Sequence, residues 1–450
     1  MKKNDEPKPI EKPLPYLAAA VITTAAFFLI AFSELPVYAK AVACIACLAI
    51  CGKALQIAGG FIGGWGVIVL RGRNGFNAMK ILAQKFASQS TALSELGLTL
   101  FFGALYGWKL FGKNPKKLAA HLLVLVFFAW AFQMTATGRA DLTPVFTIIS
   151  VLFGLAATFF IIIAMNAFSI GTNFETAAPG AMPAIPGLTL PIEAIASLVI
   201  LMIVHEMAHG ILFFIEKLKV KSSGVILFGF IPIGAFVEQD EKQFEKTPIE
   251  KRRRVLVAGS TANFLTAFLF VILSVPLAIA LGATSGGVFV NTVSNASNAY
   301  GVLPENSTII ALNGVPIASS TDLGNAMQPL EAGEVARIQT KEGGDYSVTL
   351  KEKGKLGIIV SNTPKQGMEL PYAALALLFS VANLTALLNL MVALFNMMPL
   401  FITDGHYIIR DELIHALGPK REKQALLSSK AIAIIFLLIL AVNFLPWLKG

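Results

Sequence analysis

The sequence predicts a polytopic α-helical membrane protein of about nine transmembrane helices, with a membrane-associated β-hairpin and an inserted small α+β domain. Of its 450 residues, 55% are hydrophobic and only 14% are charged, which excludes an ordinary soluble globular protein. The apolar residues are concentrated in runs long enough to cross a bilayer. These runs are 16–33, 41–70, 93–111, 118–136, 145–166, 190–215, 255–281, 371–400 and 429–447.

The N-terminal part contains two irregular runs. The run 41–70 is too long for one simple helix, and its glycine-rich end predicts a break into a span and a re-entrant piece. The run 93–111 contains Glu95 and Trp108, which suit an interfacial hairpin as well as a span. We expect residues 1–15 to be a solvated cytoplasmic tail without a signal-peptide cleavage site, and residues 16–166 to form transmembrane helices of unassigned role.

Three cysteines, Cys44, Cys47 and Cys51, share one helical face of the run 41–70. A metal or redox site would need partner ligands, and none accompany them. We therefore expect them to pack between helices.

The formal net charge of +9 indicates loops beside anionic lipid and no nucleic-acid partner, because the basic residues flank the apolar runs. The segment 217–254 is rich in lysine and arginine, which assigns it to the cytoplasm. With nine spans, the N-terminal tail and the basic segment 420–423 fall on the same side. The basic stretch 109–117 violates this pattern, which is a second reason to doubt the span 93–111.

The segment 283–366 is polar and rich in glycine and asparagine, and is long enough for a small domain. Alternating residues predict strands, Asn313 and Gly314 predict a turn, and a helix should begin near Ser320. In this order the segment resembles a PDZ domain, whose carboxylate-binding loop we expect near 285–290. An unrelated small β domain is the alternative. The predicted strands are 288–293, 309–312, 336–340 and 346–350.

The run 190–215 contains an HExxH motif formed by His205, Glu206 and His209. Positions i and i+4 lie on one face of a helix, so both imidazoles can bind one Zn²⁺ while Glu206 reaches its water. Ionisable residues are costly inside a bilayer and usually mark function there. Two histidines that hydrogen-bond across a helix bundle are the alternative.

A catalytic zinc ion needs a third protein ligand and an open position for water. Near the end of the eighth run the chain reads NMMPLFITDG, which contains Asn396 and Asp404. Threading the chain through the predicted spans puts this segment and the HExxH motif in the cytoplasmic half of the membrane. We therefore expect His205, His209 and Asp404 to bind one Zn²⁺ per chain. A plain helix-end carboxylate is the alternative reading of Asp404.

An HExxH motif in a transmembrane helix, followed after a PDZ-like insertion by NxxPxxxxDG, resembles the site-2 protease family of intramembrane zinc metalloproteases, peptidase family M50. The likeness covers roughly residues 185–415. It implies a protease core at 185–282, the PDZ-like domain at 283–366 and C-terminal transmembrane helices at 371–450. It also implies that Glu206 is the general base.

Two further segments are similar to parts of that family. The segment 230–238 resembles a membrane-embedded hairpin whose edge pairs with substrate, which implies substrate binding at Gly234, Ala235, Phe236 and Val237. The segment 258–263 resembles a GxxxN motif, although Ser260 stands where many members have proline. Asn263 and Asn396 are candidates for holding the substrate backbone.

The resemblance implies cleavage of transmembrane protein substrates in the bilayer of a prokaryotic cell. The active site would face the cytoplasm, and the PDZ-like domain would lie outside, where it could bind peptide termini and exclude bulky substrates. Two other functions remain open: a zinc-binding membrane transporter, and a catalytically silent relative that binds membrane proteins.

Overall fold

A computed structural model describes residues 13–59, 61–73, 75–136, 143–175, 177, 179–181, 184–187 and 189–446. Residues 1–12 of the predicted tail therefore lie outside the described residues. The chain divides into two compact units, one formed by Met1–Leu269 with Leu384–Gly450 and the other by Phe270–Asn383. Two long helices, α9 and α11, have residues in both.

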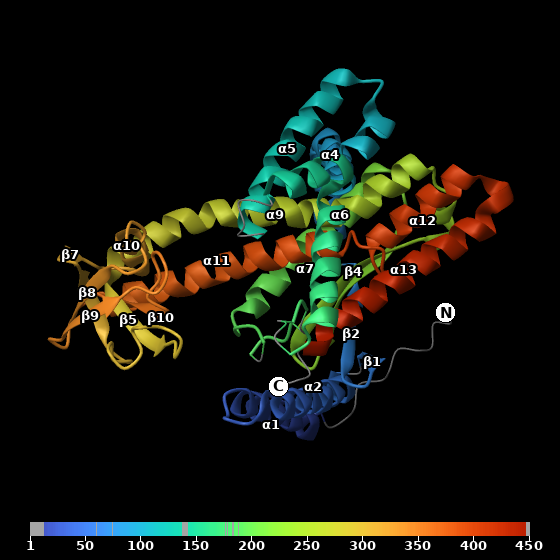
Figure 1. The fold of residues 1–450 in the computed structure, drawn as a ribbon. Coiled ribbons are helices and arrows are strands. Elements are labelled where there is room, and N and C mark those ends of the chain that lie inside the picture. Colours follow the sequence, from blue (N-terminus) through green and yellow to red (C-terminus); the bar gives the residue numbers. More distant parts are fainter. Residues whose placement is uncertain are drawn as a thin grey trace. The chain divides into compact units, whose positions relative to one another are not determined.

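The first unit is mainly helical, with one sheet (Figure 1). Its core is built from apolar side chains of α4, α5, α6, α9, α11, α12 and α13 and of the segment between α11 and α12. Its helices, with the two shared ones, are α1 (Leu14–Ala31), α2 (Val37–Gly59), α3 (Phe76–Lys85), α4 (Ala87–Phe111), α5 (Pro115–Ala136), α6 (Thr143–Thr172), α7 (Ala194–Ile215), α8 (Glu241–Glu245), α9 (Ile249–Thr284), α11 (Glu369–Phe395), α12 (Asp404–Leu417), the 3₁₀ helix η1 (Pro419–Arg421) and α13 (Glu422–Phe444).

Eight helical segments of the described chain are long and apolar enough to cross a membrane. They lie in α1, α2, α5, α6, α7, α9 and α11, and in η1 with α13. The expected count of nine is not confirmed, because α4, which carries Glu95 and Lys109, is not among them. Large apolar side chains such as Ile435 and Leu438 remain exposed on α13, as lipid-facing residues do.

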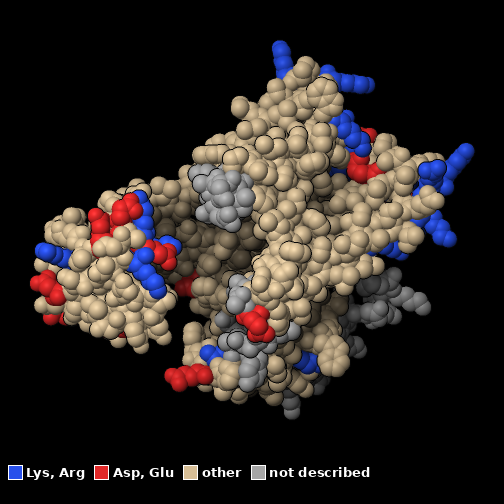
Figure 2. All heavy atoms as spheres, viewed as in Figure 1, with Lys and Arg blue, Asp and Glu red and all other residues tan. Residues whose placement is uncertain are grey.

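Charged side chains of this unit are unevenly distributed. On the face drawn in Figure 2 most of its surface is uncharged, and lysines and arginines gather near the α4–α5 turn and the α12–α13 junction. Glu95 pairs with Lys117 and lies 3.7 Å from Arg254. The basic stretch that conflicted with nine spans therefore lies beside the basic start of α9.

The sheet of this unit has four antiparallel strands in the order β1-β2-β3-β4. β3 (Val220–Phe228) and β4 (Ile231–Gln239) form the expected hairpin. β1 (Ile62–Gly64) and β2 (Val67–Gly72) come from the run 41–70, which does break at its glycines. The piece beyond the break is a β-ribbon that joins the hairpin, and this the sequence had not predicted.

Helices α4 and α6 cross where each is interrupted by a glycine. Gly103 has φ 84° and ψ −178°, and Gly154 has φ 91° and ψ 166°. A β-carbon on either glycine would collide with backbone atoms of the other helix. Beside the crossing, Ser150 bonds Nε2 of Gln133 at 3.1 Å and Thr158 at 2.7 Å, so the hydroxyl groups buried there have hydrogen-bond partners.

The cysteines lie in the contact between α1 and α2. Cys44 and Cys51 are buried, and their sulfur atoms lie 3.9 Å and 3.7 Å from the carbonyl oxygens of Phe27 and Ala20. All three are free thiols. This is the packing role that the sequence predicted.

The second unit contains a small antiparallel domain with the strand order β10-β5-β6-β8-β9, in which β7 pairs with β6. The predicted strands, the turn at Asn313 and the helix after Ser319 are all present. The prediction of a carboxylate-binding loop at 285–290 is wrong, because these residues begin β5, which pairs with both β10 and β6. The elements are β5 (Ser285–Val293), β6 (Thr308–Leu312), β7 (Val315–Pro316), α10 (Ser320–Met327), β8 (Val335–Thr340), β9 (Asp345–Thr349) and β10 (Ile358–Pro364).

Candidate functional site

Helix α7 directs the imidazoles of the HExxH motif to one side and its carboxylate to another. His205 and His209 are one turn apart, and their Nε2 atoms lie 3.2 Å from each other. Successive residues of a helix are separated by about 100°, so Glu206 projects from an adjacent face of α7, beside the pair of rings. The motif thus serves two neighbouring surfaces of α7.

Helix α9 presents a matching face to the two imidazoles. Val255, Gly259 and Asn263 recur every four residues and so lie along one side of α9. The carbonyl oxygen of Val255 is 2.8 Å from Nδ1 of His209, and Nδ2 of Asn263 is 3.0 Å from Nδ1 of His205. A β-carbon at Gly259 would lie 2.5 Å from Nε2 of His209 and 2.6 Å from Nε2 of His205. The glycine therefore leaves room for the rings and for an ion between them.

The segment between α11 and α12 brings Asp404 to the same place. Thr403 caps α12 by accepting a hydrogen bond from the N–H of His406. The side chain of Asn396 donates to Oδ2 of Asp404 at 2.6 Å, and the backbone carbonyl of Asn396 accepts from the N–H of Gly405 at 2.9 Å. A side chain at Gly405 would collide with the backbone of Met397, so the spacing of NxxPxxxxDG creates a tight turn that aims Asp404 inward.

The three candidate ligands suit a zinc ion. Oδ2 of Asp404 lies 3.2 Å from Nε2 of His209 and 3.7 Å from Nε2 of His205, and the ligand atoms all lie within 4.8 Å of one another. Tetrahedral zinc with bonds of about 2.0–2.2 Å places its ligand atoms roughly 3.4 Å apart. The donor set, two nitrogens and one oxygen, is also one that zinc accepts.

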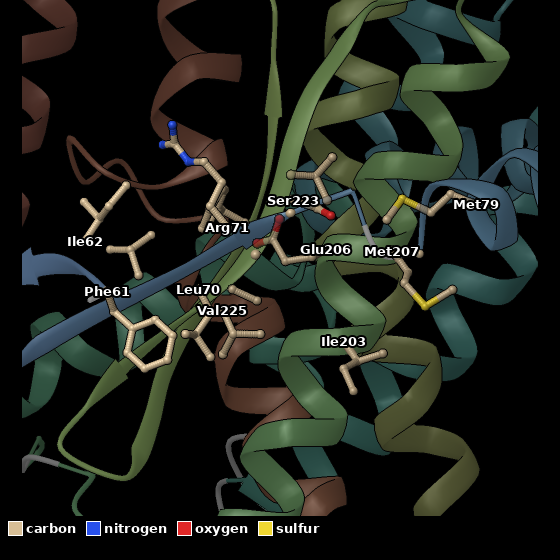
Figure 3. Close-up of a pocket in the computed structure, with 17 residues that line it drawn as sticks. Phe61, Ile62, Leu70, Arg71, Met79, Ile203, Glu206, Met207, Ser223 and Val225 are labelled. Carbon is tan, nitrogen blue, oxygen red and sulfur yellow. The ribbon is translucent and has the colours of Figure 1, made fainter. Parts of the chain in front are cut away.

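Glu206 faces a largely apolar pocket of about 710 Å³ between α7 and the sheet. The backbone N–H of Val237 on β4 lies against its carboxylate. Ala235, Phe236 and Val237 line the pocket, whereas Gly234 does not. Figure 3 shows Glu206 reaching from α7 toward the strands, with Ile203, Met207 and Met79 on the helical side and Phe61, Ile62 and Leu70 on the other.

Much of the pocket wall comes from residues that the sequence had not assigned to the site. Ile62, Arg71 and Met79 belong to β1, β2 and α3, and Phe61 directly precedes β1. All four are N-terminal to the recognised motifs. The glycines after residue 58 and the β-branched run 67–69 were the available signals of a strand. They do not reveal which distant strand it joins.

Both predicted substrate-binding asparagines contact candidate metal ligands. The side chain of Asn263 contacts His205. The side chain of Asn396 donates a hydrogen bond to Asp404, and its Nδ2 atom lies 3.3 Å from Nε2 of His205. Their expected contact with a substrate backbone stays a prediction.

The carboxylate of Glu412 fixes the far part of α12. It accepts hydrogen bonds from the Tyr106 hydroxyl, from Lys109 at 2.7 Å and from Arg253 at 2.7 Å. Burial raises the pKa of Glu412, but the hydrogen bonds from Lys109 and Tyr106 outweigh it and hold the pKa below its usual value. The helix that begins at Asp404 is thus joined to both α4 and α9. No sequence motif had indicated this residue.

Comparisons with known proteins show the family of this chain and several similar proteins. Residues 193–440, more than half of the chain, match the model of peptidase family M50. An uncharacterized protein of Methanocaldococcus jannaschii is 29% identical over 220 residues, which are 48% of this chain and 56% of that protein. The chain thus spans little more than half the length of this curated relative.

Proposed function

This chain belongs to peptidase family M50, and on that basis we propose that it is an intramembrane zinc metalloprotease of the site-2 type. The family and the eight apolar helices make it an integral membrane protein. The observation that carries the proposal is the meeting of His205, His209 and Asp404 at zinc-ligand spacing, with Glu206 beside them on a pocket. The proposed substrates are membrane-spanning segments of other proteins.

In the proposed reaction His205, His209 and Asp404 hold the ion. When bound, zinc lowers the pKa of its water and polarises the scissile carbonyl. Glu206 accepts a proton from the attacking water on its carboxylate and delivers it to the amine nitrogen as the C–N bond breaks. The Val237 N–H beside this carboxylate keeps it oriented toward the pocket.

The substrate is proposed to bind as an added strand. A transmembrane helix hides its carbonyl groups in internal hydrogen bonds, so the segment must unwind before attack. In the described part of the chain β4 pairs only with β3, which leaves its outer backbone groups for a peptide. We assign this contact to the segment Gly234, Ala235, Phe236 and Val237. The apolar pocket beside it suits the side chains of a membrane segment.

The small domain of the second unit is proposed to be a PDZ-like module that binds peptide termini. A groove of about 450 Å³ runs between α10 and the edge strand β10. The turn 354–357 closes one end, with positive φ at Gly354 and Gly357 and with Lys355 on the rim. In this turn the N–H groups of Gly354 and Lys355 already donate to the carbonyl oxygens of Leu330 and Glu352. The ammonium group of Lys355 is therefore the group proposed to attract a peptide carboxylate.

The proposed location is a prokaryotic cell membrane, with the site toward the cytoplasm and the PDZ-like domain outside. The cluster of basic residues at the start of α9 supports this orientation, because arginine and lysine are retained on the cytoplasmic side.

The test is Glu206→Gln in protein reconstituted into liposomes with a panel of single-span membrane proteins. Wild type should cleave at least one of them. The variant should lose roughly 10²-fold or more of that rate and still hold one zinc per chain. Glu193→Gln, just before the same helix, is the matched control and should cleave normally.

Loss of zinc from His205→Ala and Asp404→Ala, measured by metal analysis, would support the ligand assignment. Cleavage at the wild-type rate by Glu206→Gln would remove the proposed base. Zinc uptake into the liposomes without any cleavage would favour the transporter alternative.

A further inference from the structure

Each candidate histidine ligand needs a hydrogen-bond acceptor at the ring nitrogen that does not face the metal. The Nε2 atoms converge with Asp404, so both Nδ1 atoms must carry the protons in the metal-bound state. His209 has its acceptor in the carbonyl oxygen of Val255. Among the described residues, the group that meets Nδ1 of His205 is the carboxamide of Asn263, at 3.0 Å.

The carboxamide of Asn263 contains a buried oxygen without a partner. Asn263 is fully buried, and its Oδ1 has no hydrogen-bond partner among the described residues, while Nδ2 faces Nδ1 of His205. Two nitrogens that must both donate repel each other. A half-turn of the carboxamide exchanges its nitrogen and oxygen and places Oδ1 against the Nδ1 proton.

We propose that Asn263 is a positioning residue that accepts a hydrogen bond from Nδ1–H of His205 and thereby keeps Nε2 of this ring free for the metal. This proposal rests on the zinc site of the proposed function. It gives Asn263 a task different from the substrate contact expected for it. The two histidines then differ in the kind of acceptor that holds them. The acceptor for His205 is a side chain, which a substitution can remove, whereas the acceptor for His209 is the backbone carbonyl of Val255.

The experiment compares the zinc affinities of Asn263→Leu, Asn263→Ala and Asn263→Asp, by chelator competition on the purified full chain in detergent. The first two remove the acceptor and should weaken zinc binding by about 10- to 100-fold. The aspartate variant keeps an acceptor oxygen and should bind zinc within about threefold of wild type. The visible spectrum of the Co²⁺-loaded protein should change in the leucine and alanine variants, because the orientation of His205 changes.

The matched control is Asn389→Leu, a second fully buried asparagine on α11, whose Oδ1 has no partner among the described residues and whose Nδ2 donates to the carbonyl oxygen of Thr385. It should bind zinc as wild type does, and thermal unfolding checks that each variant is folded. The proposal is overturned if all Asn263 variants bind zinc with equal affinity. That result is expected if Asn263 only donates a hydrogen bond to the substrate. Equal losses in Asn263→Leu and Asn389→Leu overturn it as well.

These results separate the two proposals. Zinc binding that depends on Asn263 in a protein that cleaves none of the substrates supports the positioning role and contradicts the proteolytic function. Cleavage with no dependence of zinc affinity on Asn263 does the reverse.

Discussion

Two pairs of helices in the first unit are brought together by glycine, with different purposes. Where α7 meets α9, Gly259 sits in a regular helix, and a side chain there would strike the imidazoles of His205 and His209. Where α4 meets α6, Gly103 and Gly154 interrupt their helices, and side chains there would strike backbone. The first contact makes room for ligands, and the second makes room for the chain itself.

The two contacts differ in the property that their glycines preserve, which is metal binding at one and the stability of the fold at the other. Backbone cannot move aside without shifting a whole helix, so the crossing of α4 and α6 should govern the stability of the fold. Imidazole rings can rotate aside, so the crossing at the site should tolerate a methyl group at the expense of metal binding. Stability and metal affinity should therefore respond separately.

Gly154→Ala should have the largest effect. Its φ of 91° with ψ of 166° is a combination that is nearly confined to glycine, and the new methyl group would strike the backbone of Phe101. Strain and overpacking together should cost about 3 to 5 kcal/mol of unfolding free energy. Denaturant titration in detergent measures this. Gly171→Ala, on the same helix with open space around it, is the control, and equal losses in the two variants would contradict the role of the crossing.

Gly259→Ala should leave the fold intact and reduce zinc binding. Alanine favours the helix by up to about 1 kcal/mol over glycine, whereas the displaced rings should lose zinc affinity by about 100-fold, on the order of 3 kcal/mol. Gly282→Ala, on α9 with nothing near it, should bind zinc normally. The distinction between the two crossings fails if Gly259→Ala unfolds the protein or keeps full zinc affinity.

Glu412→Gln tests the connection between the regions and should have the smallest effect. The variant weakens charge-assisted bonds to Lys109 and Arg253, at a cost of about 1 to 2 kcal/mol near pH 7. Because the folded pKa of Glu412 lies below its usual value, this contribution is present above about pH 4.3 and lost as the pH falls through the folded pKa.

The unfolding midpoints of wild type and Glu412→Gln should therefore differ at pH 6 and converge as the pH is lowered below about 4.3. Glu331→Gln breaks an exposed pair with Lys353 and should show no such convergence. A constant gap between wild type and Glu412→Gln across this range would mean that the charge of Glu412 does not contribute.

The local parts of this molecule were predictable, and the long-range parts were not. The spacing of His205 and His209 needs only the helical period, and the turn at Asn313 needs only its own residues. The pairing of β2 with β3 joins Val67 to Phe228, and an apolar run gives no sign of so distant a partner. Glu412 was missed for the same reason, because its partners lie on α4 and α9.

The position of β2 has a consequence for the direction from which a substrate can approach. A two-stranded hairpin has two open sides to which a peptide could be added. β2 covers the side of β3, so the described sheet keeps one long open side, the nine residues of β4, and a short one at the three residues of β1. The strand that makes this choice lies outside residues 193–440. A chain trimmed to residues 193–440 would keep every candidate metal ligand. It would lose β2, the strand that limits where a substrate peptide can pair with the sheet.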